Sequence, residues 1–118
     1  MKWRIRNIIC LLLGAIAVSA SAQVPPDEDA VKVSPQFYTI RFENDQVRVL
    51  EYRLPPGAKE AMHSHPAGVV HYLSDATFRT GSIKKGDVEW RDFTRHTSEN
   101  TGTTEAHILA IELKNSDP

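Results

Sequence analysis

The sequence predicts an all-β domain, and three observations support this prediction. From residue 37 onward, short runs rich in β-branched and aromatic residues alternate with turn residues at close intervals. The turns include Pro55-Pro56-Gly57 and Asn100-Thr101-Gly102, residue types that favour sharp changes of chain direction. No segment keeps a helical apolar period over three turns. Many short strands without helices are typical of a β-sandwich or a β-barrel.

The runs that are expected to form strands follow one another closely along the chain. They cover residues 37–42, 47–54, 69–73, 76–80, 88–91 and 106–113. The first two are joined through Glu43-Asn44-Asp45-Gln46, which reads as a hairpin turn. The last run is apolar at both alternating positions, so both of its faces should be covered. A central strand or a dimer interface satisfies that requirement.

The first 22 residues have the organisation of a secretory signal peptide. Lys2, Arg4 and Arg6 precede an apolar stretch over residues 8–17, and the small residues Ala20-Ser21-Ala22 form a cleavage site. The apolar stretch is shorter than the ~20 residues that a transmembrane helix needs. We therefore expect cleavage, a periplasmic or secreted mature chain, and no membrane attachment afterwards.

The mature chain is expected to consist of a tether and one small domain. Residues 23–36 carry three prolines, three acids and few large apolar groups, a composition that predicts a flexible acidic tether. The domain then covers residues 37–118, and the single cysteine, Cys10, lies in the signal. A domain this small without disulfides is commonly stabilised by association or by a metal. We expect a homodimer.

The charge of the mature chain excludes nucleic acid as an expected partner. Without the three basic signal residues, 11 Lys and Arg remain against 15 Asp and Glu, a formal net charge of −4. A protein that follows a phosphate backbone needs a basic face. The expected partner is instead a small-molecule ligand or substrate, besides a second copy of the chain.

Histidines at two places predict a metal site. In His63-Ser64-His65 the two imidazoles would point to the same face of a strand, because side chains alternate along a strand. His96 follows 31 residues later, with Asn100 four residues beyond it. Three imidazoles with open positions left for water or substrate are typical of catalytic rather than structural metal sites.

Residues 47–114 resemble a small single-domain cupin. The first cupin motif begins with Gly, five residues and His-x-His, as do Gly57, residues 58–62 and His63-Ser64-His65. The second motif begins with Gly and ends with His, three residues and Asn, as do Gly86, His96 and Asn100. The resemblance implies a cupin-type jelly-roll β-barrel, with a divalent metal bound by His63, His65 and His96.

The chain departs from the cupin motifs where the fourth ligand, a glutamate, would stand. Residues 66–71 read Pro-Ala-Gly-Val-Val-His, so His71 is a further candidate ligand, with a strand histidine that faces water or a partner as the alternative. Asp92-Phe93-Thr94 replaces the Pro-x-Gly of the second motif. Three neutral imidazoles favour Zn, Fe, Ni or Cu.

Several side chains near the motifs are candidates for a ligand pocket. Arg91 and Arg95 could hold a carboxylate ligand or form surface ion pairs with neighbouring acids. Trp90 and Tyr72 could line an apolar pocket or pack in the core. Asn100 is expected to fix its turn through its side-chain amide, and His107 to be a hydrogen-bonded core residue.

Three functions are compatible with this sequence. The first is metal-dependent catalysis on a small organic substrate, which the open coordination positions favour. The second is a non-catalytic periplasmic binding or sensing module, favoured by the missing glutamate and by the absence of an acid/base pair from the motifs. The third is a metal-free structural barrel. No residue is assigned a catalytic role, and the sequence does not decide whether the protein is an enzyme.

Overall fold

The computed structural model describes residues 14–15 and 23–114. The predicted signal peptide lies almost entirely outside the described residues. Among the residues described, no helix is long and apolar enough to cross a bilayer. Two short helical turns come first, η1 (Pro26–Glu28) and α1 (Ala30–Val33). Nine strands follow: β1 (Tyr38–Glu43), β2 (Val47–Leu54), β3 (His63–His65), β4 (Gly68–Tyr72), β5 (Ala76–Phe78), β6 (Gly81–Ile83), β7 (Val88–Arg91), β8 (Thr94–His96) and β9 (Ala106–Leu113).

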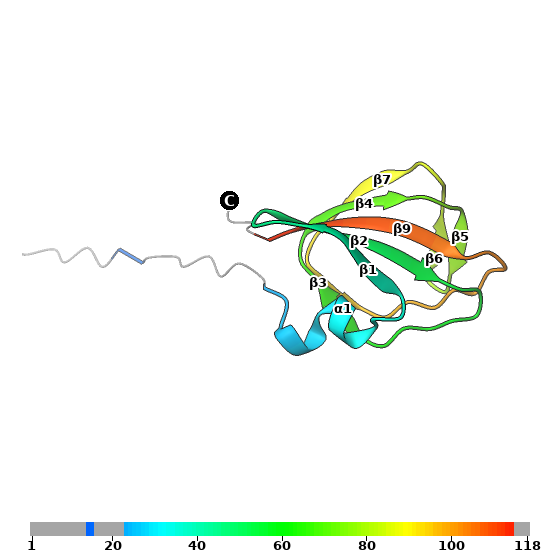
Figure 1. Ribbon diagram of the computed structural model, residues 1–118, viewed down its shortest axis with the longest axis horizontal. Coiled ribbons are helices and arrows are strands. Elements are labelled where there is room, and N and C mark those ends of the chain that lie inside the picture. Colours follow the sequence, from blue (N-terminus) through cyan, green and yellow to red (C-terminus); the bar gives the residue numbers. More distant parts are fainter. Residues whose placement is uncertain (1–13, 16–22, 115–118) are drawn as a thin grey trace, which may run out of the picture.

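The strands form one large sheet and two small ones. The large sheet is antiparallel and has five strands in the order β1-β2-β9-β4-β7, which run side by side in Figure 1. Two-stranded sheets are formed by β3 with β8 and by β5 with β6. Residues of all three sheets line one cavity, so the small sheets face the inner side of the large one. The all-β, jelly-roll prediction is confirmed.

Most strand predictions agree closely with the structure. The strands predicted at 47–54, 88–91 and 106–113 have the bounds of β2, β7 and β9. The last of these is the central strand of the large sheet, as its apolar character at both parities indicated. The predicted strand at 76–80 is different, because β5 ends at Phe78 and pairs with β6 through a two-residue turn. Gly81 allows this turn with a φ of 149°.

The N-terminal segment differs from the flexible tether that its composition predicted. Residues 26–33 form η1 and α1, and α1 lies against β3 (Figure 1). Ala30 is fully buried in the core. The Asp29 side chain caps α1 by accepting a hydrogen bond from the Val31 backbone N–H at 3.0 Å. This segment is therefore part of the folded domain, which begins about ten residues earlier than expected.

The outer face of the large sheet carries a continuous apolar row. Directly paired residues of neighbouring strands lie on the same face of a sheet. The registers place five such residues in line across all five strands: Phe42, Val49, Ile111, Val69 and Trp90. We call this set the outer row. Its two ends are half exposed, with 54% of Phe42 and 56% of Trp90 accessible to solvent.

The inner face of the same sheet carries most of the apolar core together with several buried polar side chains. Leu50, Leu54 and Ala106 are fully buried there. Another row on this face joins Tyr38, Tyr52, Ile108 and Tyr72 across four strands. Buried polar side chains on and opposite this face include Glu60, His63, His65, Asn100 and Glu112. The interior is thus organised around a polar site.

Candidate metal centre

The three histidines of the two motifs converge on one point inside the barrel. Strands β3 and β8 are antiparallel neighbours, and their register sets His63 directly opposite His96. His65 lies two residues after His63 and so points to the same side. Its Nε2 atom is 2.9 Å from the Nε2 atom of His63. One nitrogen from each of the three rings lies within 4.8 Å of the others.

The hydrogen bonds of His63 and His65 leave two nitrogen lone pairs facing one another. The Nδ1 atom of His63 donates to the carbonyl oxygen of Ala61 at 2.8 Å. The Nδ1 atom of His65 donates to the Glu112 carboxylate at 2.8 Å. In a neutral imidazole that donates from Nδ1, Nε2 carries no proton. Two acceptors 2.9 Å apart repel each other unless a cation or proton lies between them.

Burial keeps His65 and His96 neutral. Desolvation lowers the pKa of His65 to about 4, even though the hydrogen bond to Glu112 acts in the opposite direction. Desolvation and the nearby His65 and His63 lower the pKa of His96 to about 3. The Nε2 atom of His96 is buried and has no hydrogen-bond partner among the described residues. Neutral, unpartnered imidazoles are suited to bind a metal ion.

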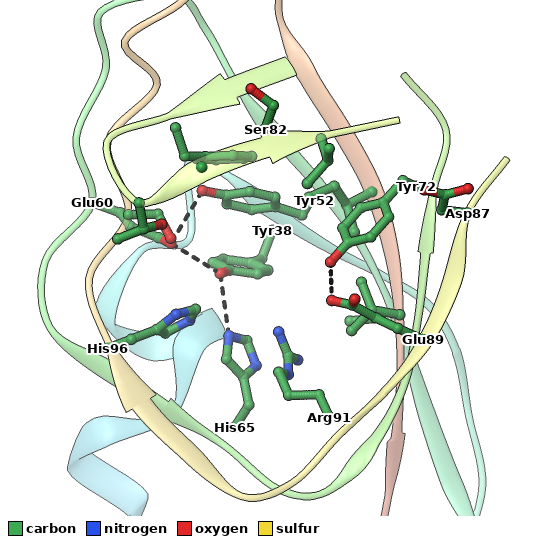
Figure 2. A pocket seen from close by; sticks show the side chains of 18 residues that line it. Tyr38, Tyr52, Glu60, His65, Tyr72, Ser82, Asp87, Glu89, Arg91 and His96 are labelled. Atoms are coloured by element: carbon green, nitrogen blue, oxygen red, sulfur yellow. Dashed lines mark hydrogen bonds between the residues drawn. The ribbon is translucent and has the colours of Figure 1, made fainter. Parts of the chain in front are cut away.

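A buried carboxylate lies beside the three histidines, although no acid stands at the motif position shortly after His65. The Oε1 atom of Glu60 is 3.6 Å from Nε2 of His63 and accepts a hydrogen bond from Tyr52 Oη at 3.1 Å (Figure 2). Tyr38 Oη lies 3.4 Å from the same oxygen and 3.2 Å from Nε2 of His63. Desolvation raises the pKa of Glu60. Glu60 is a functional candidate that the sequence analysis missed.

A chain of hydrogen-bonded charged groups orients His65 through its Nδ1 atom. Glu112 accepts from His65 through Oε1 and from Arg48 through Oε2, with Nη2 of Arg48 at 2.8 Å. The same Nη2 atom donates to Asp29 Oδ2 at 2.6 Å. Desolvation opposes ionisation of Asp29, but the bonds from Arg48 and from the backbone of α1 keep its pKa below the ordinary value. A carboxylate behind a histidine fixes the ring orientation and raises its basicity as a ligand.

The cavity next to the histidines has a volume of about 410 Å³ and opens on one side to solvent. His65 and His96 form one wall together with Arg91 from β7. Tyr72 and Glu89 lie beside Arg91 and are hydrogen-bonded to each other (Figure 2). The lining also includes the apolar side chains Val70, Phe78, Ile83, Ile108 and Ala110. This size is typical of small-molecule sites.

The structure separates the remaining predicted site residues into two groups. Arg91 and Tyr72 line the cavity. His71, Trp90 and Arg95 do not, because each is adjacent in its strand to a residue that points inward. His71 and Trp90 lie on the outer face, and Arg95 forms an ion pair with Glu28 at 3.0 Å. His71 is thus too far from the trio to replace the glutamate of the motif.

Asn100 takes the structural role that was expected of it, whereas His107 does so only in part. Asn100 is fully buried, and its amide donates to the carbonyl oxygens of Leu54 and Thr104 at 2.9 and 2.8 Å. Its Oδ1 atom accepts from the Gly102 backbone N–H at 3.0 Å. Nε2 of His107 is 2.8 Å from Glu51 Oε1 on the outer face, so His107 is hydrogen-bonded but only partly buried.

Comparison with known proteins first identifies the class of fold. No family model and no curated protein sequence matches this chain. Among solved structures, an uncharacterized double-stranded β-helix protein from Klebsiella pneumoniae is similar, with 19% identity and a TM-score of 0.54 over 69% of this chain and 78% of that one. The polyketide cyclase RemF from Streptomyces resistomycificus has 13% identity and a TM-score of 0.55, over 69% of this chain and 66% of that one. The chain is therefore a double-stranded β-helix domain.

A further match gives this class its more specific name. A cupin domain from Bordetella pertussis Tohama I is 27% identical, with a TM-score of 0.58 over 66% of this chain and 92% of that one. The protein has the cupin fold, as the motifs around His63, His65 and His96 implied. The buried trio is compatible with metal binding.

Proposed function

We propose that this protein binds a divalent metal ion through His63, His65 and His96. The observation that carries the proposal is the pair of Nε2 lone pairs, 2.9 Å apart, with both Nδ1 atoms already used as donors. A cation between them removes their repulsion and also gives a partner to the buried Nε2 of His96. Nitrogen donors favour Zn, Fe, Ni or Cu.

Glu60 would add an oxygen donor to the three nitrogen donors of the histidines. Its Oε1 atom is held toward the histidines by the phenol groups of Tyr38 and Tyr52. A carboxylate at this position supplies the negative charge that the motif glutamate provides in cupins. When bound, the metal would act as a Lewis acid or activate a water molecule. Tyr38 and Glu60 could then accept or return a proton beside it.

The alternative is a non-catalytic binding or sensing module in the same cavity. The observation that favours it is that most carboxylate oxygens near the site are already hydrogen-bonded: those of Glu112 by Arg48 and His65, and Oε1 of Glu60 by two tyrosines. Only Oε2 of Glu60 has no hydrogen-bond partner among the described residues. Oxygen uptake or turnover by the metal-loaded protein would decide for catalysis.

The metal content of untagged protein tests the proposal directly. We expect nearly one equivalent of Zn, Fe, Ni or Cu by mass spectrometry of the purified protein, and its loss in the His63→Ala/His65→Ala double variant. The matched control is His71→Ala, on the outer face of β4, which should keep its metal. Absence of metal from the parent protein after incubation with each of the four ions would refute the proposal and favour a metal-free barrel.

We further propose that the chain is exported and that two copies associate through their outer rows. Export is supported by the N-terminal sequence pattern, and sequencing of the exported protein should begin at Gln23. Association is supported by the half-exposed Phe42 and Trp90 at the ends of a row that no described residue covers. A sheet face is complementary to a copy of itself across a two-fold axis. The nearby charged residues Arg41, Glu51 and Arg53 are paired within the chain and do not oppose this packing.

A further inference from the structure

One cation in the cavity has no hydrogen-bonded counter-ion among the described residues. Arg91 extends from β7 toward the histidines and lies next to His65 in Figure 2. Among the described residues it forms no ion pair or side-chain hydrogen bond, and its Nε atom is buried without a partner. Burial lowers the pKa of its guanidinium group. Leaving a charge desolvated and unpaired is costly, and proteins keep such a group mainly where a ligand completes it.

The acids around Arg91 are engaged elsewhere. Glu112 holds Arg48 and His65, and Glu89 accepts the hydroxyl proton of Tyr72. On the other side of the cavity, Glu60 accepts from the tyrosines. Glu112 and Glu89 still act on Arg91 through their charge, but no acid among the described residues is hydrogen-bonded to it. Its NH groups face the same cavity into which the histidines point.

We propose that the ligand of this cavity is a small monocarboxylic acid with an apolar body, whose carboxylate lies between Arg91 and the metal. This inference rests on the proposed metal site. A guanidinium group matches a carboxylate because both are planar and can form two parallel hydrogen bonds. The apolar body would pack on Phe78, Ile83 and Ile108, which also line the cavity.

The charges of the cavity favour a monoanion over a phosphate or another dianion. Asp87, Glu89 and Glu60 are also among the lining residues. Their negative charges offset the positive charges of a divalent metal and Arg91, so little net positive charge is left to attract a ligand. A single negative charge satisfies Arg91, whereas a second would face these carboxylates. The volume of about 410 Å³ has room for a benzoate-sized molecule.

Titration of the Co²⁺-loaded protein tests the ligand class, because cobalt reports its own coordination in its visible spectrum. The probes are benzoate, acetate, benzamide and inorganic phosphate, with binding followed by absorption and by calorimetry. We expect benzoate to bind more tightly than acetate, since it adds the apolar body. Benzamide, which lacks the charge, should bind at least tenfold more weakly than benzoate. Benzamide or phosphate binding as tightly as benzoate would overturn the proposal.

Variants of Arg91 assign the binding to this residue. Arg91→Met should weaken benzoate at least tenfold while the cobalt content stays the same, and Arg91→Lys should weaken it less. Arg53→Met, which removes an arginine from the outer face, is the matched control and should bind benzoate normally. Metal-free Arg91→Met should also unfold at the same or a higher temperature than the parent, because a buried unpaired charge is removed. Unchanged benzoate affinity in Arg91→Met would overturn the proposal.

Failure of the metal site is distinguishable from failure of the Arg91 site. If the parent protein takes up no cobalt, the proposed metal function is contradicted, and the benzoate titration is repeated on the metal-free protein. Binding that depends on Arg91 would then still support a carboxylate site, and no binding would overturn it.

Discussion

The two faces of the five-stranded sheet differ in what they cover. The inner face buries charged and phenolic groups, among them Glu112, Arg91 and Tyr38, beside the apolar core, whereas the outer face presents the outer row to solvent. Most of the buried polar groups are hydrogen-bonded; among the described residues, the buried side-chain atoms without a partner belong to Glu60, Arg91 and His96, which line the cavity, and to Ser34, which does not. A residue's function in this protein is thus decided by the face on which it lies.

The largest effect is expected from breaking the inner network at Glu112. Glu112→Leu removes the acceptor of both His65 and Arg48 in a buried position. Loss of one partner from such a buried ionic group costs about 3–5 kcal/mol of unfolding free energy. Urea unfolding of the metal-free protein, followed by circular dichroism, measures this. Glu51→Gln on the outer face is the control and should change little; equal stability of the two variants would contradict the difference between the faces.

A charge in the outer row should break association without harming the inner site. Trp90→Glu is expected to weaken the dimer about 100-fold, or roughly 2–3 kcal/mol, because aromatic residues dominate interface energies. Sedimentation velocity over a range of concentrations measures the dissociation constant. The metal content should not change. A parent protein that is monomeric at every concentration, or a variant that associates equally well, would argue against the second copy.

The backbone of β9 passes close to Gly68 of β4, so a methyl group at this position should lower the free energy of unfolding. Gly68 lies between Arg91 and Glu112 in the register of β7, β4 and β9. A Cβ atom at this position would lie 2.0 Å from the carbonyl oxygen of Ile111, so β4 and β9 must move apart. We expect Gly68→Ala to lose about 1–3 kcal/mol, as overpacked sites do. Thermal unfolding gives the value, and an unchanged midpoint would show that the sheet adapts freely.

The smallest effect is expected from Arg95, on the outward side of β8. Arg95→Gln removes an exposed ion pair with Glu28, and such pairs contribute little. Metal affinity and the unfolding midpoint should both remain close to those of the parent protein. A large loss of metal in this variant would mean that the outward side of β8 controls the orientation of His96, contrary to the separation of the two sides.

Strand parity explains how much of the site the sequence could predict. The His-x-His pair and the inward Arg91 and Tyr72 follow from alternation, and the same rule places their neighbours Trp90 and His71 outside. Applying it strictly would have excluded both from the pocket. Glu112 could also have been singled out from the sequence, because it is the only acid in the largely apolar run 106–113. Its role as the partner of His65 depends on which strands are neighbours.

Two other features could not be read from local sequence. Glu60 lies in the irregular segment before β3, and the course of that segment brings it close to the histidines. The cupin motif, in contrast, places its glutamate after the position of His65. The segment 23–36 has the composition of a tether, yet Ala30 and the ion pair of Asp29 dock it onto the barrel. Tertiary contacts across long sequence separations decide both cases. Strand bounds, in contrast, depend on local turns and were predicted well.

The bond between His65 and Glu112 also determines when during folding the site becomes complete. The two residues are 47 positions apart, and Glu112 belongs to the last strand to emerge during synthesis. Contacts over such separations form late, because the intervening chain must first be ordered. A growing chain that already contains all three histidines still lacks the group that orients one of them. A metal ion would therefore meet the complete set of oriented donors only after β9 has inserted between β2 and β4.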